Sequence, residues 1–307
     1  MTAAQGSPAR YRIREHRIPT AYAQPYIVTL GPDGNIWFCE SGADKIGRLS
    51  TRDYSFAEFA LPGKGSMPIG IIAGADGNLW FTQPQGHRIG RITPAGVITE
   101  FSLPTPGAGP NGIACGPDGN VWFAETAVDQ VGRITPAGTI TEFSAGITRG
   151  NRPLAPTAGF GFVWISEAEG GAVARVAMDG SICEFATPSA ASGPRAIVPG
   201  PDGHCWFVET SANAIGRIGQ DGAIVEFPFP RHGASLRGID CTPAGEFLIT
   251  ENAANLIAHM TIAGEVIEEY AIPTAQAGAR SIVAIPDGRA FFSEFDAGLI
   301  GELVPVV

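Results

Sequence analysis

Short apolar runs separated by glycine-rich turns recur along the whole chain at a nearly fixed interval. The run Asn-Ile-Trp-Phe at residues 35–38 returns at residues 78–81 and, in looser form, around Trp206. The tryptophans at this position are 43, 42, 42 and 42 residues apart, and two further steps of this length reach Leu248 and Phe291 inside similar apolar runs. The pattern predicts seven repeats of one structural unit.

Each repeat contains four brief segments of the kind that forms β-strands. In the first repeat an apolar run is followed by the turn Pro-Asp-Gly-Asn at residues 32–35, the tryptophan run, and an Ile-Gly-Arg run at residues 46–48. A Pro-Ala-Gly or Asp-Gly turn and an Ile-Thr-Glu-Phe run complete most repeats, as at residues 98–101. Glycine turns supply the positive φ that tight hairpins need. Four antiparallel strands with a period near 42 are typical of a β-propeller blade.

The two ends of the chain together supply the last blade. The seventh repeat stops after its third strand at residues 299–303, whereas residues 11–20 match residues 96–105, which contain a fourth strand. The N-terminal strand should therefore complete the last blade and close the ring. We predict an all-β, seven-bladed β-propeller over residues 11–307, preceded by a disordered N-terminal tail at residues 1–10.

Composition and charge narrow the functions open to this fold. Gly (41) and Pro (25) exceed a fifth of the 307 residues, which disfavours long helices. The net charge of -10 repels phosphate backbones and anionic lipids, so we expect neither a nucleic-acid nor a membrane partner. The chain lacks a window of 18 apolar residues and the apolar core of a secretory signal, so we expect a cytoplasmic protein, acting as a monomer.

The cysteines do not suggest a disulfide framework or a zinc site. They are odd in number and lack the Cys-x-x-Cys spacing. We expect all five to be buried free thiols: Cys39, Cys115, Cys183, Cys205 and Cys241.

Residues that recur in nearly every blade are expected to be structural. An acid stands three residues after the tryptophan position in six repeats, with Gln83 as the exception: Glu40, Glu125, Glu167, Glu209, Glu251 and Glu294. One such carboxylate alone could be catalytic. Its repetition indicates a need common to all blades, such as accepting hydrogen bonds from backbone or from a neighbouring arginine. The tryptophans and the arginine series that begins with Arg48 should likewise pack between blades.

Function is expected where the repeat symmetry breaks. Eleven residues before each tryptophan position, at the start of the innermost strand, the blades carry Tyr26, Ile69, Asn111, Pro153 (or Leu154), Arg195, Arg237 and Arg280. Innermost strands line the central channel, so the three arginines should converge near one mouth. Their forked donors suit carboxylate, phosphate or polarised carbonyl oxygen. In an alternative interpretation, Arg195, Arg237 and Arg280 pair with Glu209, Glu251 and Glu294 of their own blades.

Two histidines are candidates for a general base. His87, in the second-blade loop, and His232, just before Arg237, are expected on the same face as the arginines. The other histidines are interpreted as structural or solvent-facing: His16 on the closing strand, His204 in a turn of the opposite face, and His259 in the Ile-Gly-Arg series.

The blade motif also carries a family likeness. Gly-Pro-Asp-Gly-Asn-(Ile/Val)-Trp-Phe-x-Glu, with Ile-Gly-Arg-Ile-Thr and Thr-Glu-Phe, resembles the virginiamycin B lyase (streptogramin B lyase) family over about residues 11–303. The resemblance implies a seven-bladed propeller that binds a cyclic depsipeptide antibiotic at one face. It also implies ring opening by Mg²⁺-assisted elimination at the ester, in which a histidine removes the α proton and the metal stabilises the enolate.

The residues that this resemblance makes catalytic are mostly replaced. At the positions of the family's two site histidines stand Arg237 and Arg280, and the family's acid two residues before the second histidine is Gly278. Glu294 or Asp296 is the counterpart of the remaining acid and hence the candidate Mg²⁺ ligand. An arginine neither coordinates Mg²⁺ nor acts as a base at neutral pH.

Three hypotheses follow from these residues. The first is a lyase-like propeller that binds an anionic or ester-containing small molecule at Arg195, Arg237 and Arg280, with Asn111 and Tyr26 beside them. If this propeller is catalytic, Arg237 or Arg280 would stabilise an enolate or oxyanion, with His232 or His87 as base. The second hypothesis is a non-catalytic propeller that binds a peptide or protein, and the third is a metal-dependent lactonase or hydrolase.

Overall fold

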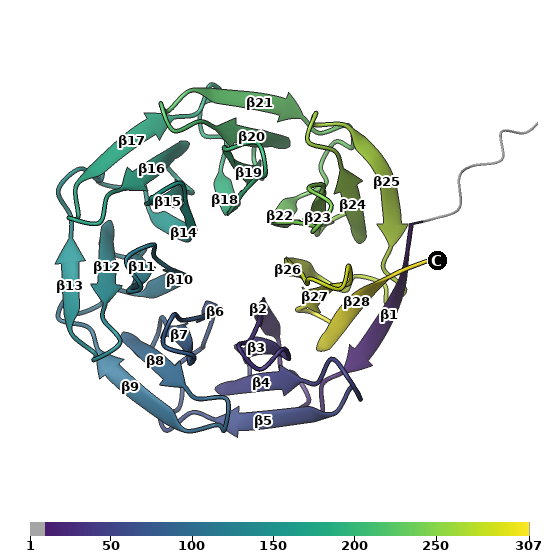
Figure 1. The fold of residues 1–307 in the computed structure, drawn as a ribbon, viewed down its shortest axis with the longest axis horizontal. Helices are drawn as coiled ribbons and strands as arrows, with labels where there is room; N and C mark the ends of the chain where they lie inside the picture. Colours follow the sequence, from purple (N-terminus) through teal and green to yellow (C-terminus); the bar gives the residue numbers. More distant parts are fainter. Residues whose placement is uncertain (1–9, 307) are drawn as a thin grey trace, which may run out of the picture.

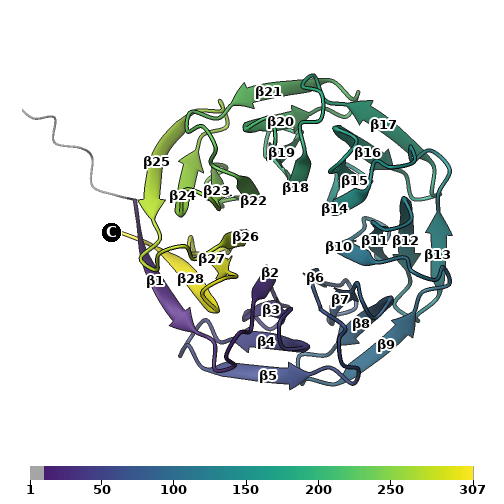
Figure 2. The same ribbon diagram turned by 180° about the vertical axis from the view of Figure 1, so that it is seen from behind.

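The computed structural model describes residues 10–306 and shows a ring of seven four-stranded antiparallel sheets (Figure 1). Within the described residues there is no helix, and hence no helix able to cross a membrane. The innermost strand of every sheet faces the centre of the ring and the fourth strand lies at its periphery, in the view from behind as well (Figure 2). The predicted seven-bladed, all-β propeller is confirmed.

Six blades are continuous in sequence and run from the inner to the outer strand. Blades one to three are β2 (Pro25–Leu30), β3 (Ile36–Glu40), β4 (Lys45–Leu49), β5 (Phe56–Ala60); β6 (Ile71–Ala73), β7 (Leu79–Gln83), β8 (Arg88–Ile92), β9 (Ile98–Ser102); and β10 (Pro110–Cys115), β11 (Val121–Glu125), β12 (Gln130–Ile134), β13 (Ile140–Phe143). Blades four to six are β14 (Pro153–Gly159), β15 (Phe162–Glu167), β16 (Ala172–Val176), β17 (Ile182–Ala186); β18 (Pro194–Pro199), β19 (Cys205–Glu209), β20 (Ala214–Ile218), β21 (Ile224–Pro228); and β22 (Leu236–Cys241), β23 (Phe247–Glu251), β24 (Leu256–Met260), β25 (Val266–Ala271).

The seventh blade combines both ends of the chain. It consists of β26 (Ala279–Ala284), β27 (Ala290–Glu294), β28 (Leu299–Pro305) and, outermost, β1 (Tyr11–Arg17). The register of β1 against β28 runs from Tyr11 opposite Pro305 to Arg17 opposite Leu299, so the predicted closure is confirmed (Figure 1). The predicted disordered tail at residues 1–10 lies outside the described residues except for Arg10, whose side chain forms an ion pair with Glu246.

The core lies between neighbouring blades and explains two of the repeated series. Trp37 is fully buried and packs against Leu79 and Phe81 of the next blade. The Arg48 guanidinium lies 5.5 Å from the centre of the Trp37 ring, within the range of a cation–π contact, and donates to the Pro94 carbonyl oxygen of the next blade at 3.1 Å. The tryptophans and this arginine series therefore join one blade to the next.

Residues that lie opposite each other on the second and third strands of each blade are matched in size. In five blades a glycine of the third strand lies opposite a phenylalanine of the second, as with Gly132 and Phe123, and a Cβ on Gly132 would overlap that ring. In blades four and six the same pair of positions holds alanine and isoleucine, Ala174 opposite Ile165 and Ala258 opposite Ile249. The sequence thus keeps the summed volume nearly constant, as close packing requires.

The repeated acids have a partner that the sequence did not indicate. Each is fully buried and faces a carboxyl group of the outer strand, as Glu125 faces Glu142. Burial, followed by the charge of the facing carboxylate, raises the pKa of this series to about 7 or 8: Glu40, Glu125, Glu167, Glu209, Glu251 and Glu294.

The expectation that backbone groups or neighbouring arginines bind this series was therefore wrong for most members. Across residues 10–306, Glu251 is the one member of the series in an ion pair with an arginine, 3.3 Å from Arg231. In blade two Gln83 takes the place of the acid, and its amide donates to Glu100 at 3.0 Å. The Gln83 amide thus supplies the donor that a protonated glutamic acid would supply in the other blades.

The cysteines are free, as predicted, but they are not uniformly buried. Cys39 and Cys205 lie in the core, Cys115 and Cys241 are half-buried, and Cys183 is exposed on the outer strand β17. The expectation of burial was wrong for Cys183, because side chains alternate between the two faces of the outer strand and this one lies on the solvent face.

Candidate active site at the channel mouth

A β-bulge near the start of the inner strand turns the symmetry-breaking residues toward the channel. Six inner strands shift register between their first and fourth residues, as between Leu236 and Ile239 in β22. A bulge places an extra residue in one strand and redirects its side chain. In β22 the residue after Leu236 is Arg237, so the bulge falls at the position that the sequence singled out.

Six of these positions line one cavity at the mouth of the central channel. Its volume is about 110 Å³, and its lining includes all five residues predicted to bind a ligand together with Leu154: Tyr26, Asn111, Leu154, Arg195, Arg237 and Arg280. Blade four contributes Leu154 rather than Pro153. Ile69 of blade two is buried and does not line the cavity.

The three arginines have no acidic partner. Across residues 10–306 no ion pair involves Arg195, Arg237 or Arg280, and the buried Nε atoms of Arg195 and Arg280 have no hydrogen-bond partner. The alternative in which they pair with glutamates of their own blades is therefore wrong.

Burial, and then the charges of Arg195 and Arg280, lower the pKa of Arg237. Both causes disfavour the charged form of Arg237: it is partly removed from water, and the positive charges of the neighbouring guanidinium groups repel its own. A bound anion would offset this repulsion.

Arg280 is held in place by two aromatic rings, one of which the sequence analysis missed. Its guanidinium carbon lies 3.7 Å from the centre of the Phe295 ring and 5.0 Å from that of Tyr26. The two rings meet edge to face at 5.6 Å. Phe295 breaks the repeat symmetry too, because Ser41 and Thr126 occupy its position in blades one and three. Stacking covers one face of the guanidinium and leaves its N–H edge for a ligand.

The candidate bases are not brought to this cavity. His87 is exposed, has a φ of 50°, and its Nδ1 accepts a hydrogen bond from the Gly109 backbone at 3.4 Å. Asp129 occupies the same loop position in blade three and likewise accepts from the Arg152 backbone at 3.0 Å, so His87 acts as one member of a set of loop acceptors. His232 is exposed in the connection before β22, and it does not line the cavity.

The residues present do not fit a Mg²⁺ ion. The carboxyl group of Glu294 is buried against Glu15, with its pKa raised to about 8, and Asp296 is exposed. The Asp296 carboxylate fills the space that a side chain at Gly278 would need. Across the described chain no three His, Cys, Asp or Glu side chains are placed to hold a metal ion. The mouth instead presents guanidinium groups, which donate hydrogen bonds and repel cations.

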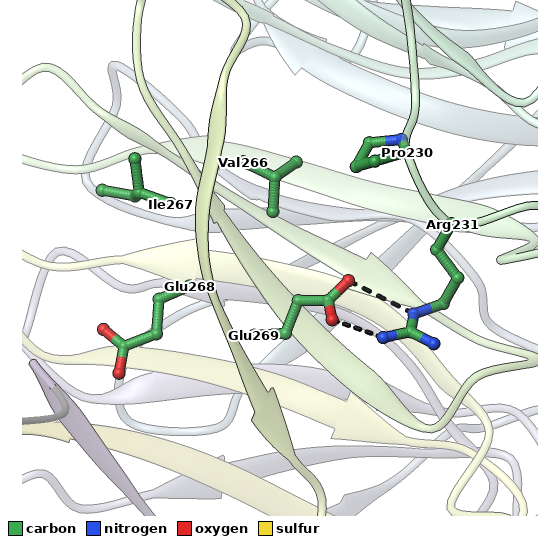
Figure 3. A pocket seen from close by; sticks show the side chains of 6 residues that line it. All are labelled: Pro230, Arg231, Val266, Ile267, Glu268 and Glu269. Carbon is green, nitrogen blue, oxygen red and sulfur yellow. Dashed lines mark hydrogen bonds and ion pairs between the residues drawn. The ribbon is translucent and has the colours of Figure 1, made fainter. Parts of the chain in front are cut away.

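A second hollow, on the outer rim, differs in charge. The groove between blades five and six has a volume of about 440 Å³ and is lined by Pro230, Arg231, Val266, Ile267, Glu268 and Glu269 (Figure 3). Its arginine, Arg231, is paired with the carboxylates of Glu269 and Glu251. The charge of Arg231 in this groove is therefore neutralised, unlike the charges of the three arginines at the channel mouth.

Comparison with known proteins gives a consistent result. The sequence model described as "Virginiamycin B lyase family" matches residues 8–162 and 160–306. Among solved structures, selenomethionine-substituted virginiamycin B lyase from Staphylococcus aureus is similar at a TM-score of 0.91 and 32% identity, over 96% of this chain and 100% of that one. A catalytically inactive histidine-to-alanine variant of the S. aureus lyase, with quinupristin, is similar at 0.91 and 34% over 96% and 100%. A Kuenenia stuttgartiensis hydrazine synthase, at a TM-score of 0.75 and 12% identity over 99% of each chain, shares the fold alone.

Proposed function

Because this chain belongs to the virginiamycin B lyase family and yet presents three unpaired arginines at its channel mouth, we propose that it binds an anionic or ester-containing small molecule there. The observation that carries the proposal is the convergence of Arg195, Arg237 and Arg280 in one cavity without a carboxylate partner. The protein as a whole carries a net charge of -10, so a cluster of three arginines without acidic neighbours is unexpected.

The chemistry of the mouth favours an oxyanion as the group bound. Forked guanidinium donors bind carboxylate and phosphate oxygens by paired hydrogen bonds, and such charge-assisted bonds are stronger than neutral ones. Tyr26 and Asn111, whose side chains carry a hydroxyl and an amide, line the same cavity. An ester carbonyl would bind less strongly than a full anion, because it carries no net charge.

The family's elimination reaction is not part of this proposal. The S. aureus relative is catalytically inactive after one histidine-to-alanine change. By the resemblance set out above, this chain has arginine at both positions where the family motif carries histidine, and no acidic cluster in the described part of the chain is placed to hold Mg²⁺. We therefore expect no Mg²⁺-dependent opening of a streptogramin B ring.

Calorimetric titration with acetate, inorganic phosphate and citrate tests the proposal. We expect saturable binding that weakens by at least roughly tenfold in Arg237→Ala and Arg280→Ala, the loss of about one charge-assisted bond. Arg12→Ala is the matched control, because Arg12 is an exposed arginine of β1, away from the cavity. Equal affinity in wild type and both mouth variants, with unfolding curves unchanged, would overturn the proposal.

A second assay addresses catalysis directly. The protein is incubated with quinupristin, with Mg²⁺ or with a chelator, and the products are separated by chromatography and weighed by mass spectrometry. Elimination yields a ring-opened isomer of unchanged mass, whereas hydrolysis adds one water. A Mg²⁺-dependent isomer would contradict our account of the site, because residues other than Arg237 and Arg280 would then have to supply the base and the metal ligands.

A further inference from the structure

The mouth cavity continues into a second cavity in the central channel. This lower cavity has a volume of about 280 Å³. The two cavities have several lining residues in common, among them Ile27, Ala155, Ala196, Ile239 and Ile282. A ligand bound at the arginines therefore has space for a further group directly below them.

The wall of the lower cavity is mainly aliphatic. Branched side chains from all but one of the inner strands line it, including Ile71, Ile113, Ile197 and Val283. Its one ionisable residue, Asp240, does not present a free carboxylate. Its two oxygens accept hydrogen bonds from the backbone N–H groups of Cys241 at 2.9 Å and Ala284 at 2.8 Å.

The charge at the mouth is also one-sided. The three arginines come from consecutive blades, on β18, β22 and β26, whereas the residues from the other blades, Leu154 on β14, Asn111 on β10 and Tyr26 on β2, carry no cationic group (Figure 1). A compact inorganic anion would satisfy only the arginine side and would leave the aliphatic channel in contact with water. A ligand with one charged end and one apolar end satisfies both surfaces.

We propose that the ligand is an amphipathic carboxylate with an unbranched alkyl tail: the carboxylate binds Arg195, Arg237 and Arg280, and the tail lies in the Ile/Val-lined channel. This inference rests on the proposed anion site and adds the chemical class of the ligand. A water-sized group takes about 30 Å³, so the lower cavity holds roughly nine such groups. The tail is therefore a medium-length chain.

A homologous series of straight-chain carboxylates tests the tail. Acetate, butyrate, hexanoate, octanoate and decanoate are titrated into the protein by calorimetry at constant ionic strength. Affinity should rise roughly fourfold for each added methylene, the usual gain from burying such a group. The increase should stop near the chain length that fills the channel, and octanol, which lacks the charge, should bind far more weakly than octanoate.

The possible outcomes separate this inference from the proposed function. Binding of acetate and octanoate with equal affinity, both lost in Arg237→Ala, would overturn the tail and leave the anion site intact. No saturable binding of any carboxylate or of phosphate would overturn both. An increase with chain length that persists unchanged in Arg237→Ala and Arg280→Ala would place the tail elsewhere and also overturn the inference.

A blocking variant gives an independent check. Thr157 lines the lower cavity but not the mouth, and its hydroxyl makes no hydrogen bond within the described residues. Thr157→Trp should end the affinity increase at a shorter chain than in wild type. Thr141→Trp, at an exposed position of β13, is the matched control and should behave as wild type. An unaltered series in folded Thr157→Trp would contradict a tail in the channel, and if this variant fails to fold, the wild-type series alone decides.

Discussion

Replacing Glu125 by glutamine is expected to stabilise the propeller at alkaline pH and to change little under acidic conditions. Glu125 is fully buried and faces Glu142, and burial followed by the charge of Glu142 raises its pKa from 4.5 to about 8. With a pKa of about 8, the Glu125 carboxyl group of the folded protein is mostly protonated at neutral pH and able to donate to the facing Glu142, whereas in the unfolded chain it is ionised. Glutamine keeps a hydrogen-bond donor at this position but has no ionisable carboxyl group.

The magnitude follows from the difference between the folded and unfolded pKa. Because the folded pKa is the higher one, the contribution of Glu125 to stability is complete below pH 4.5 and is lost as the pH rises to about 8. Each pH unit in this window corresponds to about 1.4 kcal/mol. The advantage of Glu125→Gln should thus be near zero at about pH 4.5, reach about 3.4 kcal/mol at about pH 7, and level off just under about 5 kcal/mol above about pH 8.

Chemical unfolding near pH 5, near pH 7 and near pH 9 measures this difference, provided that the transitions are two-state. The reverse change, Gln83→Glu, is the matched control. The Gln83 amide already donates to Glu100 at 3.0 Å, so introducing an acid there should destabilise the protein increasingly as the pH rises. A stability difference that is the same at all three pH values, in either variant, would refute a shared proton between the paired carboxyl groups.

Three further predictions concern packing, charge and closure. Gly132→Ala should destabilise by about 1–3 kcal/mol in denaturant unfolding, because its methyl group overlaps Phe123, and adding Phe123→Ile should recover part of the loss; an additive double variant would contradict the size match. Arg237→Met should raise the free energy of unfolding of the ligand-free protein by about 1 kcal/mol at about 0.01 M salt and by less at about 1 M, because it removes repulsion between like charges; an effect that does not depend on salt would contradict this. Deleting the chain through Arg17, which removes β1, should expose the edge of β28 and give oligomers in light scattering, whereas a stable monomer would show that closure is dispensable.

The architecture could be predicted from the sequence because the pattern of one blade recurs seven times along the chain. The tryptophan spacing fixed the blade count, and the likeness of residues 11–20 to residues 96–105 indicated the closing strand that pairs Tyr11 with Pro305. Repetition also separated structural residues such as Arg48 from singular ones such as Arg237. A local pattern that recurs is strong information about local structure.

The rest depended on contacts between residues far apart in sequence. The sequence could place Arg195, Arg237 and Arg280 on inner strands, but whether they faced the channel or their own glutamates depended on a bulge and on the outer-strand acids. The stacking of Phe295 on Arg280 joins two strands of the seventh blade and was not visible as a motif, although the broken repeat at that position was a usable signal. The loop position of His87 suggested a general base, but its Nδ1 accepts a hydrogen bond from the Gly109 backbone, a contact that the sequence does not reveal.

The pairing of β1 with β28 also has a consequence for the order in which this protein can be completed during its synthesis. Tyr11 leaves the ribosome 294 residues before its partner Pro305. At about 5–20 residues per second this interval is roughly 15–60 s. During that time six blades can form in order, while the first strand made has no partner and the growing ring has two open edges. β1 is thus paired only after all the other strands of the ring have been made, and a nascent chain that stalls before β28 exposes an unpaired strand to chaperones and neighbouring chains.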